Sequence, residues 1–287
     1  MSKYIDTNGI KLHYLEFGNP GNPTLILMHG LTANAHSFDR LIRGLNNYHV
    51  LSVDLRGRGK SDKPDTHYSM QDHAQDILGL MDALELESVS LGGHSFGALL
   101  SIYLAANHSE RVNKIVLMDA AAQLHPEVKQ MVAPSMMRLE QEWPSIDAYM
   151  EAAKNAPYAD GYWNSDMESY FMADITMTED DTVRTRSRLP HITQAIEGAL
   201  GLGVTWLDHI QSIEQPGLLI NATEPYGVVG DPILPKELAM ETVNMMKNCQ
   251  YQHVSGNHLT MLFNKGADES AEAINRFLNQ QDLSQIA

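Results

Sequence analysis

Residues 89–100 read VSLGGHSFGALL, an apolar run followed by glycines around one serine and then by apolar residues at helical spacing. A buried strand that turns sharply into a helix needs small residues on both sides of the turn, because a Cβ there would strike the neighbouring backbone. Gly93-x-Ser95-x-Gly97, between a strand and a helix over 98–107, is the context of a nucleophile elbow, which exposes a serine hydroxyl at the top of a sheet. The stretch predicts a nucleophilic serine, although a tight turn with an incidental serine shares the same pattern.

Continuous apolar runs, typical of strands buried on both faces of a parallel sheet, recur on either side of this stretch. They cover residues 24–28, 50–53, 89–91, 114–118 and 218–220. Helical patterns lie between them, most clearly over 70–84, where Ser69 and Asp72 predict a capping box. Residues 3–17 contain the turn signal Asn8-Gly9 and predict a hairpin at one sheet edge. The chain therefore predicts an α/β fold with a mostly parallel, doubly wound sheet.

The alternation of strands and helices stops after Asp119 and resumes at Pro216. The residues between them show helical periodicity without a convincing strand, and they contain all three tryptophans of the chain. We expect a core domain formed by 1–119 and 210–287, with 120–209 inserted as a helical cap, or lid, over the carboxyl edge of the sheet.

Composition narrows the class of protein. The chain has 287 residues, 43% of them hydrophobic, and a net charge of −16, which would repel the phosphates of nucleic acid. No run of 18 apolar residues occurs and the first residues lack the pattern of a secretion signal, so we expect neither a membrane span nor export. The single cysteine, Cys249, cannot form an internal disulfide, which fits a cytoplasmic location.

Four segments carry a resemblance to a known family. They are His29-Gly30 after the run at 24–28, Asp54 to Asp62 (DLRGRGKSD) after the next run, Gly93 to Gly97 (GHSFG), and Gly256-Asn257-His258 near the C-terminus. In this order the chain resembles the α/β-hydrolase family of serine hydrolases. The resemblance implies Ser95 as nucleophile, His258 as base, and the backbone N–H groups of Leu31 and Phe96 as an oxyanion hole. It implies no cofactor and no metal, and gives His29 and the 54–62 turn a bracing role.

The chemistry of serine explains why a histidine is needed. A serine hydroxyl does not ionise at neutral pH, so an imidazole must accept its proton and later deliver it to the leaving group. Among thirteen histidines, His258 follows the last predicted strand, at the place where the family has its base. Position relative to Ser95 therefore favours His258.

The acid that orients the imidazole stays open at this stage. Asp119 directly follows the strand at 114–118, Glu224 lies close after the run at 218–220 but precedes a proline, and Asp231 follows several positions later. We favour Asp119 because the end of a buried strand is a rigid mount, whereas Asp231 lies beyond a glycine-containing loop. Alternatively, Asp119 has a purely structural role as the N-cap residue of the first helix of the insertion.

The cap is expected to determine the substrate. We expect Trp143, Tyr162 and Trp163 to line a pocket for a bulky, largely apolar ligand. Residues 120–209 hold fourteen Asp and Glu against six Lys and Arg, which would also favour a cationic substrate. The chain is thus expected to cleave an ester or lactone. The most specific form of this hypothesis is opening of the lactone ring of a cationic macrolide antibiotic. Cleavage of an amide or carbon–carbon bond, perhydrolysis, or ligand reception with weak turnover are the alternatives, whereas epoxide or halide opening needs a carboxylate nucleophile.

Overall fold

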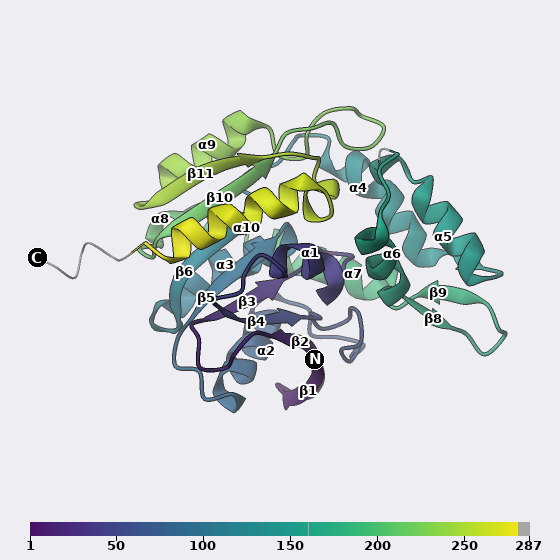
Figure 1. Cartoon of the computed structure of the whole chain (residues 1–287), viewed down its shortest axis with the longest axis horizontal. Coiled ribbons are helices and arrows are strands. Elements are labelled where there is room, and N and C mark those ends of the chain that lie inside the picture. Colours follow the sequence, from purple (N-terminus) through teal and green to yellow (C-terminus); the bar gives the residue numbers. More distant parts are fainter. Residues whose placement is uncertain (160, 281–287) are drawn as a thin grey trace, which may run out of the picture.

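The computed structural model describes residues 1–159 and 161–280, and its centre is an eight-stranded sheet (Figure 1). The strand order is β1-β2-β4-β3-β5-β6-β10-β11, with β2 antiparallel to β1 and β4 and the remaining pairs parallel. The strands are β1 (Ser2–Thr7), β2 (Ile10–Phe17), β3 (Thr24–Met28), β4 (His49–Val53), β5 (Val89–His94), β6 (Val112–Met118), β10 (Gly217–Ala222) and β11 (Cys249–Val254). The expected mostly parallel sheet and its edge hairpin are confirmed.

Helices cover both faces of this sheet. On one face, α1 (Asp39–Ile42) and α10 (Lys265–Leu278) pack on apolar residues of β3, β4, β6 and β10. On the other face lie α2 (Met70–Ala83), α3 (Phe96–Asn107), α8 (Thr205–Ser212) and α9 (Lys236–Met245). Every residue of β3 and of β4 is buried, which fits the largely apolar sequences of these strands.

Helix α2 begins at the predicted capping box. The Ser69 hydroxyl accepts the Asp72 N–H at 3.1 Å, and the Asp72 carboxylate accepts the Ser69 N–H at 2.9 Å. Two backbone donors that the helix cannot satisfy internally are thereby paired.

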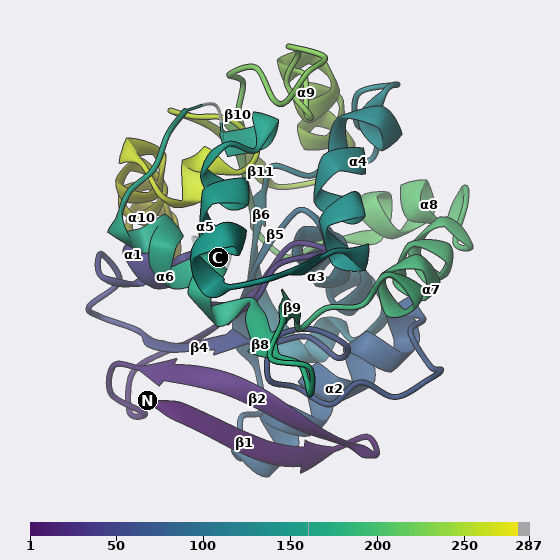
Figure 2. The same cartoon turned by 90° about the vertical axis from the view of Figure 1, so that its right-hand side faces the viewer.

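The cap is formed by the segment of the chain between β6 and β10. It stands at one end of the molecule (Figures 1 and 2). It contains α4 (Val128–Met137), α5 (Ile146–Lys154), α6 (Ser165–Ala173) and α7 (Leu189–Leu200). It also contains a small antiparallel sheet of β7 (Glu142–Trp143), β9 (Val183–Thr185) and β8 (Ile175–Met177), in that spatial order. The expectation of a cap without strands is therefore wrong, because strands of two or three residues are too short to produce an alternating pattern.

The expected boundary between residues 209 and 210 falls inside α8. This helix packs against α3 and α9, and its Ile210 is fully buried in the core cluster. The chain has therefore returned to the core by the start of α8, before the boundary that the sequence suggested. Among the described helices, none combines the length and the apolar character needed to cross a bilayer.

Three buried histidines make stability depend on pH. Burial lowers the pKa of His29 to about 4 and lowers the pKa values of His73 and His94 well below their ordinary range. In the unfolded chain these histidines have pKa values of about 6.5. At pH values between the folded-state and unfolded-state pKa, the unfolded chain binds more protons than the folded protein. The contribution of these histidines to the free energy of unfolding is therefore complete above about pH 6.5 and is lost as the pH falls.

We expect the free energy of unfolding to fall on acidification below about pH 6.5, by up to about 1.4 kcal/mol per pH unit for each of the three histidines. Urea denaturation followed by circular dichroism at about pH 7 and about pH 5 measures this. A His67→Asn variant is the control, because His67 is exposed and its replacement should leave the slope unchanged. Equal stability at the two pH values would contradict the prediction.

Candidate active site

The turn from β5 into α3 forces an unusual backbone on Ser95. Its φ of 53° and ψ of −114° lie in a region that non-glycine residues rarely adopt and that costs about 1–3 kcal/mol. A Cβ on Gly93 would collide with the backbone of Gly97, and a Cβ on Gly97 would collide with the carbonyl of Met28. Within the described part of the chain, the Ser95 hydroxyl caps no helix N–H, so it is left available for chemistry.

Asp119 and His258 are brought together from distant parts of the chain. His258 Nδ1 lies 2.7 Å from Asp119 Oδ2, at the carboxyl edge of the sheet. Asp119 directly follows β6, is fully buried and has a φ of 52°. Its other carboxylate oxygen accepts the backbone N–H of Ala222 at 2.9 Å and the side-chain N–H of Asn221 at 3.0 Å. Both oxygens of this carboxylate are therefore held by donors, which fixes the face that it presents to His258.

The other two candidate acids lie elsewhere. Asp231 is 59% exposed and lies 3.6 Å from His125 Nε2. Glu224 accepts the backbone N–H of Gly256 at 2.8 Å, two residues before His258. Glu224 thus holds the loop that carries the histidine, and Asp119 is the acid in contact with the ring.

A second histidine holds the backbone of His258. Burial lowers the pKa of His94, so its ring is neutral, and His94 Nε2–H donates to the His258 carbonyl at 2.8 Å. The two rings have their centroids 4.5 Å apart, and Tyr226 packs edge-on against His258 at 5.7 Å. These contacts restrict the imidazole to one position beside the elbow.

A cavity of about 290 Å³ lies between the core and the cap, and both Ser95 and His258 line it. Leu31 and Phe96, the expected oxyanion-hole residues, line it as well. Phe96 is the first residue of α3, where helix N–H groups have no intrahelical acceptor. The cap contributes mainly apolar and aromatic side chains, among them Val128, Val132, Met136, Tyr158, Tyr170, Phe171, Ile196 and Leu200.

The aromatic residues that the sequence suggested as lining do not face this cavity. Trp143 packs edge-on against Tyr149 with a centroid distance of 4.8 Å and borders a different cavity. Trp163 stacks on Phe171 at 5.3 Å, and the Tyr162 hydroxyl donates to the Phe263 carbonyl at 3.1 Å. Trp163 therefore supports the cavity wall indirectly, because Phe171, on which it stacks, is a lining residue.

The charges at the cavity are basic, although the cap as a whole is acidic. Among the described lining residues there is no Asp or Glu, and the charged side chains are Lys129 and Arg138. Arg138 donates to the buried Asp174 and to Tyr149, each at 2.7 Å. Lys129 is exposed on α4. The positive charge of Arg138 is therefore compensated by Asp174, a cap residue that does not itself line the cavity.

The glycine-rich turn after β4 supports the segment after β3, which carries Leu31. The Asp54 carboxylate accepts backbone N–H groups of Ala35 and Lys60, at 2.7 and 2.8 Å. His29 Nε2 accepts the Leu55 N–H at 3.0 Å, so this histidine has the expected structural position.

Sequence reasoning missed Arg58 in the same turn. Its guanidinium is fully buried, donates to the Leu31 carbonyl at 3.0 Å and lies over the Phe96 ring at 5.1 Å. Burial lowers its pKa to about 9, so it stays charged at neutral pH. The one available signal was an arginine inside a glycine-rich turn, which alone indicates nothing about its target. Among the described residues, no group of three or more His, Cys, Asp or Glu side chains is placed to hold a metal ion.

Comparisons with known proteins agree with this geometry. A family model described as alpha/beta hydrolase fold matches residues 23–162. The crystal structure of E-2-(acetamidomethylene)succinate hydrolase superposes with a TM-score of 0.81 and 23% identity, covering 98% of this chain and 99% of that chain. These matches show that the chain has the α/β-hydrolase fold.

Curated relatives are similar over part of their length. The 2-(acetamidomethylene)succinate hydrolase of Mesorhizobium japonicum is 32% identical over 154 residues, covering 52% of this chain and 55% of that protein. Epoxide hydrolase A of Mycobacterium tuberculosis is 34% identical over 124 residues, covering 42% of this chain and 38% of that protein. The matched segments span about half or less of these relatives, which differ from one another in the reaction that their names give.

Replacing Asp119 by asparagine should keep the fold and lower kcat for a p-nitrophenyl ester by about 10⁴-fold, the loss that this change causes in a serine protease. The reason is that the amide removes the charge that orients and stabilises the His258 ring. Asp231→Asn and Glu224→Gln are the matched controls, and neither removes a partner of the ring. Steady-state kinetics and thermal unfolding are measured on all three variants. Full activity in Asp119→Asn, or an equal loss in Asp231→Asn, would contradict the assignment.

Proposed function

We propose that this protein is a serine hydrolase that cleaves a carboxylic ester or lactone through an acyl-enzyme intermediate. The observation that carries this proposal is the 2.7 Å contact of Asp119 with His258, which lines the same cavity as the strained Ser95. A hydroxyl, an imidazole and a buried carboxylate in one site are the groups that acyl transfer requires.

In the proposed reaction, Ser95 Oγ attacks the ester carbonyl carbon while His258 Nε2 accepts the hydroxyl proton. The carbon–oxygen bond to the alcohol then breaks, and the imidazolium returns the proton to the leaving oxygen. A water molecule, deprotonated by the same nitrogen, hydrolyses the acyl-enzyme and restores Ser95. Asp119 keeps its negative charge throughout and holds the Nδ1–H tautomer.

The negative oxygen of each tetrahedral intermediate is assigned to the backbone N–H groups of Leu31 and Phe96. Such a donor contributes roughly 10²–10³ in rate. Arg58 supports this assignment, because its buried positive charge touches the backbone of Leu31 and the ring of Phe96.

The cavity favours a small substrate. Its volume of about 290 Å³ is just below the range of typical small-molecule sites, about 300–1,000 Å³. A macrolide would require the cap to move outward, and the two basic lining residues offer no partner for a cationic sugar. We therefore place a small, largely apolar ester or lactone first, and keep the cationic macrolide as an arm of the test.

A second candidate is hydrolysis of a small acidic amide. The relative with the name 2-(acetamidomethylene)succinate hydrolase has an acetamido group and a succinate in its substrate name. Lys129 at the cavity supplies a positive charge that a carboxylate-bearing substrate would need, whereas Arg138 is already paired with Asp174.

Mixing the protein with excess p-nitrophenyl acetate should give a burst of p-nitrophenolate stoichiometric with the protein, because acylation releases the alcohol before water regenerates Ser95. Ser95→Ala should abolish the burst and the turnover while the melting curve stays close to wild type. His258→Ala should lose as much, and the double variant no more, since the two groups act as a unit. Tight binding with neither burst nor turnover would favour a ligand receptor instead.

A panel of a neutral short ester, a succinate hemiester, 2-(acetamidomethylene)succinate and a macrolide tests the substrate class. With Lys129→Glu, kcat/KM for the anionic substrates should fall roughly tenfold, because one attractive charge becomes repulsive, while the neutral ester is unaffected. Lys154→Glu is the matched control, since Lys154 is an exposed cap residue outside the cavity lining. Preferred hydrolysis of the macrolide, detected as a product heavier by one water, would contradict the small-substrate assignment.

A further inference from the structure

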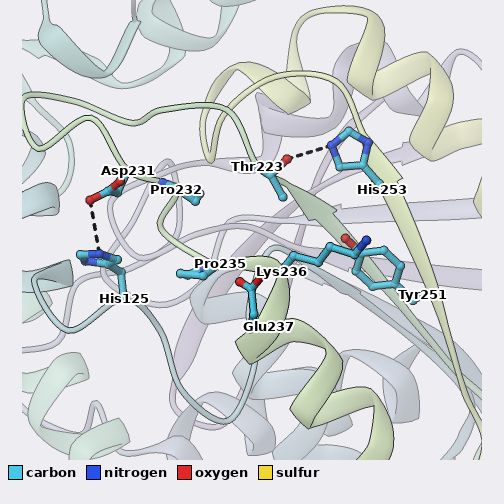
Figure 3. A pocket seen from close by; sticks show the side chains of 9 residues that line it. All are labelled: His125, Thr223, Asp231, Pro232, Pro235, Lys236, Glu237, Tyr251 and His253. Atoms are coloured by element: carbon cyan, nitrogen blue, oxygen red, sulfur yellow. Dashed lines mark hydrogen bonds and ion pairs between the residues drawn. The ribbon is translucent and has the colours of Figure 1, made fainter.

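A second cavity, of about 610 Å³, lies beside the ends of β10 and β11 (Figure 3). Its wall includes Thr223, which contacts His253 at 2.9 Å, and His125, which lies 3.6 Å from Asp231. The ring of Tyr251 also lines it, with the Lys236 side chain alongside and its Nζ 5.9 Å from the ring centroid. The proposed reaction uses none of these residues.

The hydroxyl of Tyr251 points from this cavity into the sheet. It donates to Asn221 Oδ1 at 3.0 Å. Asn221 Nδ2 in turn donates to Asp119 Oδ1 at 3.0 Å and to the Leu234 carbonyl at 2.9 Å. An uninterrupted chain of hydrogen bonds therefore runs from the second cavity to the carboxylate that holds His258.

Strand register produces this connection. In the parallel pair of β10 and β11, Leu219 lies opposite Tyr251 and Asn221 lies opposite His253. Residues two positions apart on a strand share a face, so Asn221 and Tyr251 are diagonal neighbours on the same face of the sheet. Helix α9 packs against both strands. Asn221 is fully buried, so its amide depends on these partners alone.

The partners also fix which way the amide points. Its oxygen faces the Tyr251 hydroxyl, and its nitrogen faces a carboxylate and a carbonyl, both of which accept hydrogen bonds only. A rotated amide would place its oxygen against the Asp119 carboxylate. Burial, together with the nearby carboxylates of Asp119 and Glu237, raises the pKa of Tyr251, so its hydroxyl keeps the proton that it donates.

We propose that Tyr251 and Asn221 are positioning residues for the reaction: Tyr251 locks the Asn221 amide, and Asn221 orients and stabilises the Asp119 carboxylate that holds His258. The expected effect on kcat rests on the proposed function. The arrangement of the hydrogen bonds is independent of it.

The test compares Tyr251→Phe and Asn221→Leu with Tyr48→Phe. Tyr48 is the matched control because its hydroxyl also donates to an asparagine oxygen, that of Asn279 at 2.9 Å, away from the site. For a p-nitrophenyl ester we expect kcat to fall about 3- to 10-fold in Tyr251→Phe and about 10- to 100-fold in Asn221→Leu, with KM unchanged in both. Tyr48→Phe should keep the wild-type kcat.

A spectroscopic readout separates this role from a merely structural one. The proton between His258 Nδ1 and Asp119 Oδ2 gives a low-field ¹H resonance, which we expect to be displaced in Tyr251→Phe and unchanged in Tyr48→Phe. This measurement needs no turnover, so it decides the proposal even if the protein hydrolyses none of the tested esters. In that case the proposed function fails and the positioning network is judged by the resonance.

A double-mutant cycle tests the route through Asn221. In the Asn221→Leu background, Tyr251→Phe should change neither kcat nor the resonance, because the link to Asp119 is already broken. Fully additive effects would overturn the proposal, as would a Tyr251→Phe protein that matches Tyr48→Phe in both readouts. If Asn221→Leu does not fold, the comparison of the two tyrosine variants still decides whether the Tyr251 hydroxyl acts on the site.

Discussion

The close approach of α3 to the ends of β3 and β5 is the constraint on which the site depends. It leaves no room for a Cβ at Gly93 or Gly97 and holds Ser95 in a rarely adopted backbone conformation. That strain is tolerated because the strand and the helix on either side of the turn are fully packed in the core. The turn places Phe96 at the start of α3, so Ser95 and the backbone N–H of Phe96 are positioned by the same packing.

The rest of the site follows from the parallel sheet. Parallel strands bring their carboxyl ends to one edge, so residues that follow β5, β6 and β11 meet although they are far apart in sequence. Asp119 has a backbone bond to the Ile220 carbonyl at 2.7 Å, which ties the acid to the neighbouring strand as well as to its own. Because the acid follows β6, the loop after β10 can serve other purposes. Glu224, in that loop, holds the loop that carries His258, and Asn221, in β10 itself, holds Asp119.

The sequence was sufficient to predict the strands of the core sheet and the sharp turn at Ser95, because both depend on a local pattern of apolar residues and glycines. It could not decide among Asp119, Asp231 and Glu224, because each follows a strand and only the tertiary structure shows which one faces His258. The cavity lining was mispredicted for a similar reason, since the direction in which Trp143 and Trp163 point is determined by packing within the cap. Tyr251 and Asn221 were missed because they are single polar residues in otherwise ordinary strands.

The position of the cap in the chain has a consequence for evolution and engineering. The insertion starts directly after Asp119, ends before β10, and contains its own buried ion pair between Arg138 and Asp174. Ser95, Asp119 and His258 all belong to the core. A cap of different shape could therefore be exchanged at these two junctions as a cassette, so that the substrate range of the fold changes by recombination while its chemistry is inherited intact.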